Sequence, residues 1–347
     1  MSPILDLKSM NFGEIEKAVQ DLDLPRFRAK QLYSWLQKDV DSFEEMRNLP
    51  KPMLEKLSEK YYLSYAKIER KYSSKIDGTV KYLFRLHDGN LIESVVMKYK
   101  HGYSICVSSQ VGCNMGCKFC ASTIGGKERD LSAGEILSQI FTAQKDLSIR
   151  ISNVVLMGMG EPLENYDNVI RFLELVGQED GLNIGMRHIS LSTCGIVDKI
   201  YDLMEKNLQI TLSISLHAPF DNMRDEIMPI NKKYNIKKLI DACRDYTIRT
   251  GRRISFEYAL IKDFNDTKEC ADELARLLSG MISHINLIPA NPVHKGKFQK
   301  PDNTAVHKFC ELLTKKGLNA TVRRTLGSDI DASCGQLRKK HKEEVVS

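Results

Sequence analysis

The stretch YSICVSSQVGCNMGCKFC, residues 103–120, joins a strand pattern to a loop that carries three thiols. The short apolar run over 103–108 predicts a buried strand. Cys113, Cys117 and Cys120 follow within eight residues, in a loop whose two glycines allow tight bends. The three sulfur atoms can therefore converge on one centre.

The C-x3-C-x2-C spacing of this loop indicates which metal it suits. A zinc site takes four ligands, usually from C-x2-4-C pairs, and the sequence holds no second pair of that kind. Three thiolates suit a [4Fe-4S] cluster, in which one iron has no protein ligand and is free to hold a substrate. The alternatives are a chance group of cysteines, or a zinc knuckle completed by His101 or His217.

From residue 103 onward, strand patterns alternate with helix patterns. Helices are predicted between the strands, for example at 133–146 and 268–278. Six strand-helix units of this spacing predict an α/β fold with parallel strands, in a barrel, open or closed, or in a doubly wound sheet. In either arrangement ligands bind at the carboxyl ends of the strands. The predicted strands are 103–108, 153–157, 188–193, 210–216, 253–260 and 284–288.

The first hundred residues differ from the rest. Helix signals run over 11–61, where Asn11 is a typical N-cap residue and Pro25 suits the first turn of a helix. Strand patterns at 81–86 and 92–99 flank the turn residues Asp88-Gly-Asn, which predicts a hairpin. We expect a helical domain over 1–80, a β-hairpin linker over 81–100 and the barrel over 101–347.

Length, charge and cysteine count narrow the class of protein. The 347 residues allow about two domains, with a formal net charge of +6 and nine cysteines. The odd cysteine count, without a signal segment, argues against a secreted disulfide scaffold, and no apolar run is long enough to span a membrane. We expect a cytoplasmic protein with free thiols and no membrane contact. The mild positive charge permits a polyanionic partner without proving one.

The cysteine motif after the first barrel strand resembles that of the radical S-adenosylmethionine superfamily. This resemblance implies a partial (β/α)6 barrel. It also implies a [4Fe-4S] cluster on Cys113, Cys117 and Cys120, whose open iron holds S-adenosylmethionine and cleaves it to a 5′-deoxyadenosyl radical. The stretch MGMGEP, residues 157–162, resembles the Gly-Glu motif of the superfamily, which binds the cofactor's ammonium.

Further motifs resemble one family within that superfamily, the bacterial rRNA adenine methyltransferases. They occupy residues 104–113, 191–193, 215–218, 228–234, 286–292 and 329–337. The resemblance implies methylation of carbon 2 of adenosine 2503 in 23S rRNA and, in some members, of adenosine 37 in tRNA. It also implies an N-terminal helix-hairpin-helix-like domain that binds RNA. We further expect a monomer that receives electrons from a donor such as flavodoxin or ferredoxin.

The resemblance also implies catalytic roles for three residues. Carbon 2 of adenine is electron-poor, so it cannot displace a methyl group from a sulfonium directly. In the family one S-adenosylmethionine methylates a cysteine, matched here by Cys334, and a second supplies the radical that activates this methyl group. Cys106 matches the residue that takes the proton from the attacked carbon and releases the enzyme-RNA adduct through a transient disulfide with Cys334. Glu93 matches the family's acidic residue.

The same resemblance implies a set of contacts to S-adenosylmethionine, most of them at the ends of predicted strands. Leu216 would act through its backbone. Four cysteines match no role in the family, and Ser333 replaces the more usual alanine beside Cys334. The implied contacts are Gly160, Glu161, Ser192, Ser215, Leu216, His217 and Asn291.

Three other functions compete with carbon 2 methylation. Antibiotic-resistance enzymes with the same two thiols methylate carbon 8 of the same adenosine, but Glu161-Pro162 and Pro289-Ala-Asn291 look more like the carbon 2 family. A non-catalytic iron-sulfur or zinc RNA-binding protein would have no need of Cys106 and Cys334. A glycyl-radical activating enzyme would explain neither the carrier thiol nor the helical domain.

Overall fold

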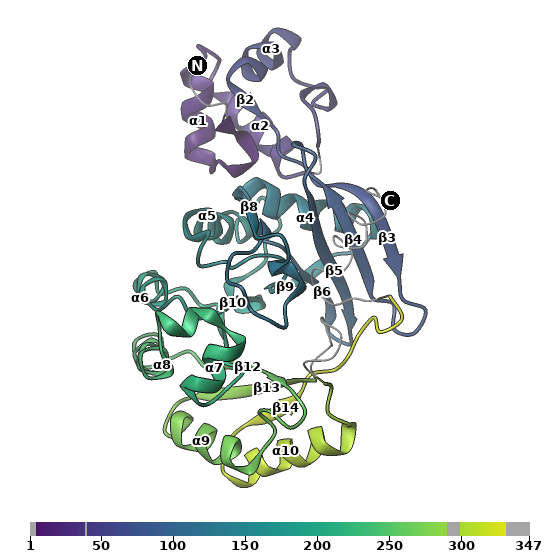
Figure 1. Cartoon of the computed structure of the whole chain (residues 1–347). Helices are drawn as coiled ribbons and strands as arrows, with labels where there is room; N and C mark the ends of the chain where they lie inside the picture. The colour runs from purple at the N-terminus through teal and green to yellow at the C-terminus, as the bar shows by residue number, and fades with distance from the viewer. Residues whose placement is uncertain (1–4, 39, 290–298, 331–347) are drawn as a thin grey trace.

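The computed structural model describes residues 5–38, 40–289 and 299–330. Its main feature is a ten-stranded sheet in the order β14-β13-β12-β11-β10-β9-β6-β5-β4-β3. The strands from β6 to β14 pair in parallel, and β3 to β5 extend the sheet beyond β6 in antiparallel fashion. Figure 1 shows this sheet curving around the middle of the molecule with helices outside it. The predicted α/β fold is confirmed.

Each of the six predicted barrel strands is present, with ends shifted by only a few residues. They are β6 (Gly102–Cys106), β9 (Ile151–Leu156), β10 (Ile189–Thr193), β11 (Thr211–Ser215), β12 (Ile254–Leu260) and β13 (Ser283–Pro289). The predicted hairpin is formed by β4 (Val80–Arg85) and β5 (Leu91–Tyr99). Because β5 also pairs with β6, this hairpin is continuous with the main sheet.

Two strands of the main sheet have no strand signal that we recognised. The edge strand β3 (Lys67–Ser73) reads KIERKYS, and its four charged residues are exposed or half-buried. β14 (Ala320–Val322) has only three residues. Within the described residues these two edge strands do not pair with each other, so the barrel stays open between them. Two small separate sheets consist of β1 (Leu5–Asp6) with β2 (Tyr61–Tyr62), and β7 (Gln110–Gly112) with β8 (Lys127–Asp130).

The helices begin at residues suited to that position. Ser132 caps α4 by accepting from the Glu135 N–H, and the Glu135 side chain accepts in return from the Ser132 N–H. Asn11 forms the same arrangement at α1, as predicted. The helices are α1 (Phe12–Gln20), α2 (Phe27–Leu36), α3 (Lys51–Lys60), α4 (Ala133–Leu147), α5 (Tyr166–Val176), α6 (Val197–Glu205), α7 (Asp221–Ile227), α8 (Ile236–Thr250), α9 (Lys268–Leu278) and α10 (Asn303–Lys315). None of the helices in the described part of the chain is long and apolar enough to cross a membrane.

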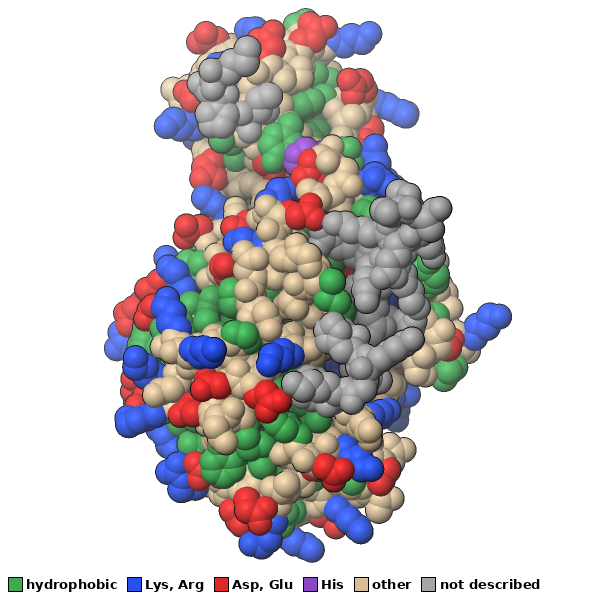
Figure 2. All heavy atoms as spheres, viewed as in Figure 1, with side chains coloured by type: hydrophobic (Ala, Val, Ile, Leu, Met, Phe, Trp, Pro, Cys, Tyr) green, Lys and Arg blue, Asp and Glu red, His purple; other side chains and the backbone are tan. Residues whose placement is uncertain are grey.

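Residues 7–63 form a lobe with a hydrophobic core of their own, at one end of the molecule (Figures 1 and 2). Asp6, directly before this lobe, joins it to α4. Its carboxylate accepts from Ser64 N–H and from Ser132 Oγ–H, and Ser132 is the N-cap of α4. A Cβ on Gly134 would lie 2.5 Å from Asp6 Oδ2, so glycine is needed for this close approach. The helical lobe is therefore fastened directly to the barrel.

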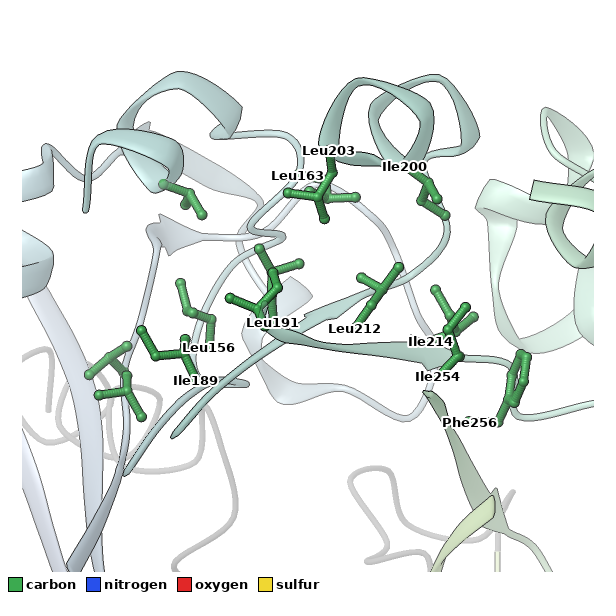
Figure 3. Packing of buried hydrophobic residues seen from close by; sticks show 14 of the residues in the cluster. Leu156, Leu163, Ile189, Leu191, Ile200, Leu203, Leu212, Ile214, Ile254 and Phe256 are labelled. Carbon is green, nitrogen blue, oxygen red and sulfur yellow. The ribbon is translucent and has the colours of Figure 1, made fainter. Parts of the chain in front are cut away.

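The two faces of the main sheet differ in character. Alternate residues of the parallel strands, such as Leu191, Leu212 and Phe256, pack outward against the helices in one large hydrophobic core. Figure 3 shows Leu191 and Leu212 directed toward Ile200 and Leu203 of α6. The other alternate residues face the inside of the barrel and are largely polar. This polar inner face is where a ligand can be bound without disturbing the core.

The chain that follows β14 crosses the open side of the barrel. Gly327 N–H donates to Asp77 Oδ2 at 2.8 Å, and Ser74 Oγ–H donates to Asp329 Oδ1 at 2.7 Å. Leu326 packs against Cys106 and its neighbours on the inner face. The last described residues of the chain are thus tied to the turn between β3 and β4.

Candidate active site

The cysteine loop leaves the short strand β7 and returns as β8. Gly112, at the end of β7, has φ +82°, and a Cβ there would lie 1.9 Å from the Gly126 carbonyl oxygen. Only glycine allows the two strands to approach this closely. The loop carrying Cys113, Cys117 and Cys120 is therefore closed at its base by backbone contact.

The three thiols of this loop lie near one another in a largely buried setting. Burial raises the pKa of Cys113 to about 12, and negative charge on Cys120 raises it as well. The pKa of Cys117 is raised in the same way, with contributions from Cys120 and Cys113. Three thiolates brought together in this way require positive charge nearby. A cationic iron cluster would supply it.

The donor set fits an iron-sulfur cluster better than one metal ion. Within the described ranges, no group of three His, Cys, Asp or Glu side chains is placed to hold a single metal ion. Zinc needs all its ligands within about 2.3 Å of one point, whereas a cluster spreads its cysteines over several irons. His101 stacks on Tyr99, and His217 Nδ1 is occupied by Ala259 N–H. Among the described residues, neither histidine therefore completes a ligand group for a zinc knuckle with the three thiols.

The Gly-Glu motif lies against the start of the cysteine segment. Met159 O accepts from Ser109 N–H at 2.9 Å and from Gln110 N–H at 3.2 Å. Gly160 has φ +110°, and a Cβ there would lie 2.7 Å from Gln110 Cβ. Glycine is thus required at this position because a side chain would separate the two segments.

Glu161 is buried beside the cysteine loop. Its Oε1 accepts from Leu163 N–H at 3.0 Å, and its Oε2 accepts from Cys194 N–H at 2.8 Å. Burial raises the pKa of Glu161, although these hydrogen bonds oppose the shift. A cation bound beside this carboxyl would favour its ionised form.

The implied contacts on β10 and β11 lie on or just beyond the polar inner face. Ser192 and Ser213 are register partners, and Ser215 is the partner of Glu257 on β12. Leu216 follows β11 with both backbone groups already bonded, its N–H to Glu257 O and its carbonyl to Arg224. The serines can therefore face a ligand, whereas the backbone of Leu216 is already used within the protein.

His217 has an unusual backbone and a fixed ring. Its φ is +58°, in the left-handed region that residues other than glycine rarely adopt. Ala259 N–H donates to Nδ1 at 2.9 Å, so the ring proton of the neutral imidazole is on Nε2. Burial lowers the pKa of His217 to about 3, and the charge of Arg224 contributes to the shift. The imidazole is therefore neutral near pH 7.

Glu93 and Cys106 share the inner face at the antiparallel end of the barrel. Val95 on β5 is the direct partner of Cys106 on β6, and Glu93 stands two residues before Val95 on the same face. Lys81 Nζ lies 3.0 Å from Glu93 Oε2, and both side chains are almost fully buried. The structure thus brings together two residues that were proposed from different motifs.

Two comparisons with family models agree with this architecture. Residues 107–278 match the model of the radical SAM superfamily. Residues 5–63 match a model described as the ribosomal RNA large subunit methyltransferase N-terminal domain. The second match covers nearly the same residues as the separate hydrophobic core of the N-terminal lobe.

Curated relatives match the chain over almost its whole length. A protein of Clostridium acetobutylicum named "Probable dual-specificity RNA methyltransferase RlmN" is 53% identical over 99% of both chains. A protein of the same name from Alkaliphilus oremlandii is 53% identical over 97% of this chain and 98% of its own. This chain belongs to the RlmN family. The crystal structure of a radical SAM methyltransferase from Sphaerobacter thermophilus has a TM-score of 0.90 and 39% identity, covering 96% of this chain and 98% of that one.

Membership of the RlmN family has a direct consequence for the cofactors. The radical SAM superfamily uses a [4Fe-4S] cluster and S-adenosylmethionine, and the cysteine loop fits such a cluster. No disulfide joins two of the eight described cysteines of this RlmN family member. Cys334 and Asn291 lie outside the described residues, so their assignments remain predictions.

Sequence reasoning missed several polar residues that shape the site of this RlmN family member. Asn286 Nδ2–H donates to Glu257 Oε2 at 2.7 Å on the inner face, and burial raises the pKa of Glu257. Arg224 is fully buried between the loops after β10 and β11. Polar residues at every second position of β10 to β13 are a signal that could have revealed the inner face. The burial of Arg224 has no comparable signal.

Proposed function

We propose that the protein methylates carbon 2 of adenosine 2503 in 23S rRNA, and adenosine 37 of tRNA, through a methyl group carried on Cys334. The observation that supports this most strongly is the shared inner-face position of Glu93 and Cys106. An acid-base group and a second thiol at one end of the barrel suit a reaction that must remove a proton and release a covalent adduct.

The proposed reaction uses two molecules of S-adenosylmethionine per turnover. The Cys334 thiolate attacks the methyl group of the first and displaces S-adenosylhomocysteine, which leaves S-methylcysteine on the protein. When bound, the cluster supplies the electron that cleaves the second to methionine and the radical that takes a hydrogen atom from the S-methyl group. The sulfur-bound carbon then joins carbon 2 of the adenine. The adduct radical would then return one electron to the cluster as the Cys106 thiolate takes the proton from carbon 2. Cys106 next gives up this proton and attacks the sulfur of Cys334, so the sulfur-carbon bond breaks, a disulfide forms and the released methylene carbon is protonated to the methyl group.

Glu93 is proposed to orient or deprotonate the adenine edge. Its backbone carbonyl accepts from Ser108 Oγ–H at 2.6 Å, which fixes β5 at this point. The Lys81 ammonium compensates the charge of the buried carboxylate. These contacts hold Glu93 in one position before any RNA is bound.

The cofactor contacts are also proposals. Gly160 and Glu161 would accept from the ammonium of S-adenosylmethionine, because a buried carboxylate and a backbone carbonyl suit a cation. Ser192, Ser215 and His217 would contact its ribose and carboxylate, whereas the backbone groups of Leu216 are already bonded within the protein. Asn291 would contact the adenine or ribose edge. The described members of this set lie at the carboxyl ends of parallel strands, where such folds bind ligands.

We also propose that the N-terminal domain, expected over 1–80, binds RNA through the lobe of residues 7–63, since β3 and the β4–β5 hairpin belong to the main sheet of the barrel. On the face seen in Figure 2, Lys and Arg side chains alternate with Asp and Glu and do not gather in one patch. RNA binding by such a surface should weaken as salt is raised. A cytoplasmic monomer that receives electrons from a flavodoxin or ferredoxin fits this activity.

The proposal is tested by expressing the chain in a bacterial strain that lacks this methylation and mapping the methyl group by mass spectrometry. We expect methyl groups on carbon 2 of both adenosines. Methylation of carbon 8 alone would identify the resistance-type reaction instead. The variant Cys106→Ala should accumulate a covalent protein-RNA adduct, whereas Cys334→Ala should form none. Anaerobically reconstituted protein that binds no iron would contradict the enzymatic function altogether.

A further inference from the structure

The segment that contains α7 and the following turn has no role in the proposed reaction. It includes residues 228–234, a motif that the sequence comparison singled out. Lys118 N–H, in the cysteine loop, donates to Ile227 O at 3.0 Å. Ile227 and Met228 pack in a small hydrophobic cluster with Cys117. This segment therefore helps to hold the cysteine loop in place through these contacts.

Arg224 of α7 lies at the centre of these contacts. Its side chain is fully buried, with none of its surface exposed to solvent. The guanidinium donates to Leu216 O at 3.1 Å, to Asn231 Oδ1 at 2.9 Å, to Cys194 O at 2.7 Å and to Ser215 O at 3.1 Å. It thus joins the ends of β10 and β11 to the turn after α7.

The four acceptors of Arg224 are neutral. None of the ion pairs found within the described ranges involves this guanidinium. Arginine stays protonated in proteins, so its positive charge is held in a buried region with hydrogen bonds but without a carboxylate in contact. Such a charge is costly unless negative charge lies close by. Cys194, whose carbonyl accepts from Arg224, packs with Cys117 in one small hydrophobic cluster, so an anionic iron-sulfur cluster on the cysteine loop would put negative charge close to the guanidinium.

We propose that Arg224 is a positioning residue that raises the reduction potential of the iron-sulfur cluster held by Cys113, Cys117 and Cys120. The inference rests on the proposed function, since it requires the cluster. A [4Fe-4S] cluster with three thiolates is anionic, and reduction adds one more negative charge. A fixed positive charge in a low dielectric stabilises the reduced form more than the oxidised form. Arg224 therefore favours the one-electron reduction of the cluster that starts each turnover.

The test is a potentiometric titration of anaerobically reconstituted protein, followed by the electron paramagnetic resonance signal of the reduced cluster. In Arg224→Gln the ratio of reduced to oxidised cluster at a given potential should fall about tenfold, a shift of about 59 mV for one electron. Arg224→Lys keeps the charge and should shift the potential less. The control is Arg244→Gln, because Arg244 also donates to two backbone carbonyls but lies on α8 against the end of α9. It should behave as wild type.

A second variant changes the charge without removing Arg224. Asn231→Asp places a carboxyl group against Arg224 and beside Asp221 and Asp225, which now accept from the Asn231 amide, so the negative charge around Arg224 rises and the potential should fall as in Arg224→Gln. An unchanged potential in either variant at full iron content would overturn the proposal. If both variants keep their circular dichroism but lose iron, Arg224 only supports the loop and the electrostatic role is wrong. A wild-type protein without iron would instead contradict the proposed function.

Discussion

The imidazole of His217 packs edge-on against the phenyl ring of Phe119, with 4.7 Å between the ring centroids. Phe119 lies between two cysteines of the metal-binding loop, and His217 lies just beyond β11. The contact joins the part of the site proposed to hold the cluster to the part proposed to hold S-adenosylmethionine. Each of these loops is therefore positioned by the other.

His217→Asn should remove a source of acid instability. Asparagine can accept from Ala259 N–H and tolerates the left-handed backbone at this position. Because burial lowers the pKa of His217 to about 3, wild type should lose stability as pH falls below the unfolded value of about 6.5, by up to about 1.4 kcal/mol per pH unit. The variant should lack this contribution to the change in the free energy of unfolding with pH. Chemical denaturation at a series of pH values measures it, and parallel curves for the two proteins would contradict the prediction.

Glu257→Gln should act at the other end of the pH range. Burial raises the pKa of Glu257, so its stabilising neutral form is complete below the usual glutamate value and is lost as pH rises through the raised pKa. Glutamine keeps a neutral acceptor for Asn286 and cannot ionise. We expect the variant to lose less stability than wild type between about pH 5 and about pH 8. Equal declines for the two proteins would show that Glu257 is already ionised in the folded protein at these pH values.

Gly160→Ala should weaken binding of S-adenosylmethionine. The new Cβ would lie 2.7 Å from Gln110 Cβ, with φ at +110°, so the Gly-Glu segment must move away from the cysteine segment. A cost of about 2 kcal/mol at the site would reduce affinity by more than tenfold. Gly280→Ala is the control, since its φ is +71° and nothing lies within 4 Å of the new Cβ. Equal affinities for the two variants, measured by calorimetry, would argue against this contact.

Asp77→Asn should loosen the crossing chain after β14. The variant weakens the hydrogen bond from Gly327 N–H, which we expect to cost about 1 kcal/mol and to speed proteolysis after residue 323 several-fold. The hydrogen bonds from Gly327 and Thr79 lower the pKa of Asp77 to about 2, although burial opposes this. The stabilisation by the Asp77 carboxylate is therefore complete above the pKa near 3.8 of the unfolded chain, and it is lost as pH falls through about 2. Asp88→Asn, in the turn at the other end of β4, should leave the cleavage rate unchanged.

The parallel strands could be predicted because they are buried on a regular pattern. Residues 253–260 and 284–288 alternate apolar with polar residues between turn signals, and β12 and β13 occupy almost the same positions. The strand β3 could not be recognised, because KIERKYS is charged along an exposed edge and is ordered by its pairing with β4. Strand formation there depends on a neighbour that the local sequence does not reveal.

The candidate site was predictable where a motif has a fixed spacing, as for the three cysteines. Arg224 could not be predicted, because in sequence it stands in a short polar helix among Asp221, Asp225 and Glu226 and looks solvent-exposed. Its burial arises only when the ends of β10 and β11 and the following turn close around it. Such positions depend on contacts between distant segments, which no single stretch of sequence encodes.

The proposed adenine-facing residues and the proposed cofactor contacts are assembled in different ways. Glu93 and Cys106 lie on β5 and β6, which are joined by a tight turn, so their relative position depends on one local hairpin. The cofactor contacts are brought together from strands far apart in the chain. Their geometry forms only when all the parallel strands have assembled. During folding, the hairpin can therefore form early, at low contact order, before the cofactor pocket exists. Destabilising changes in the outer helices should damage cofactor binding well before they separate this pair.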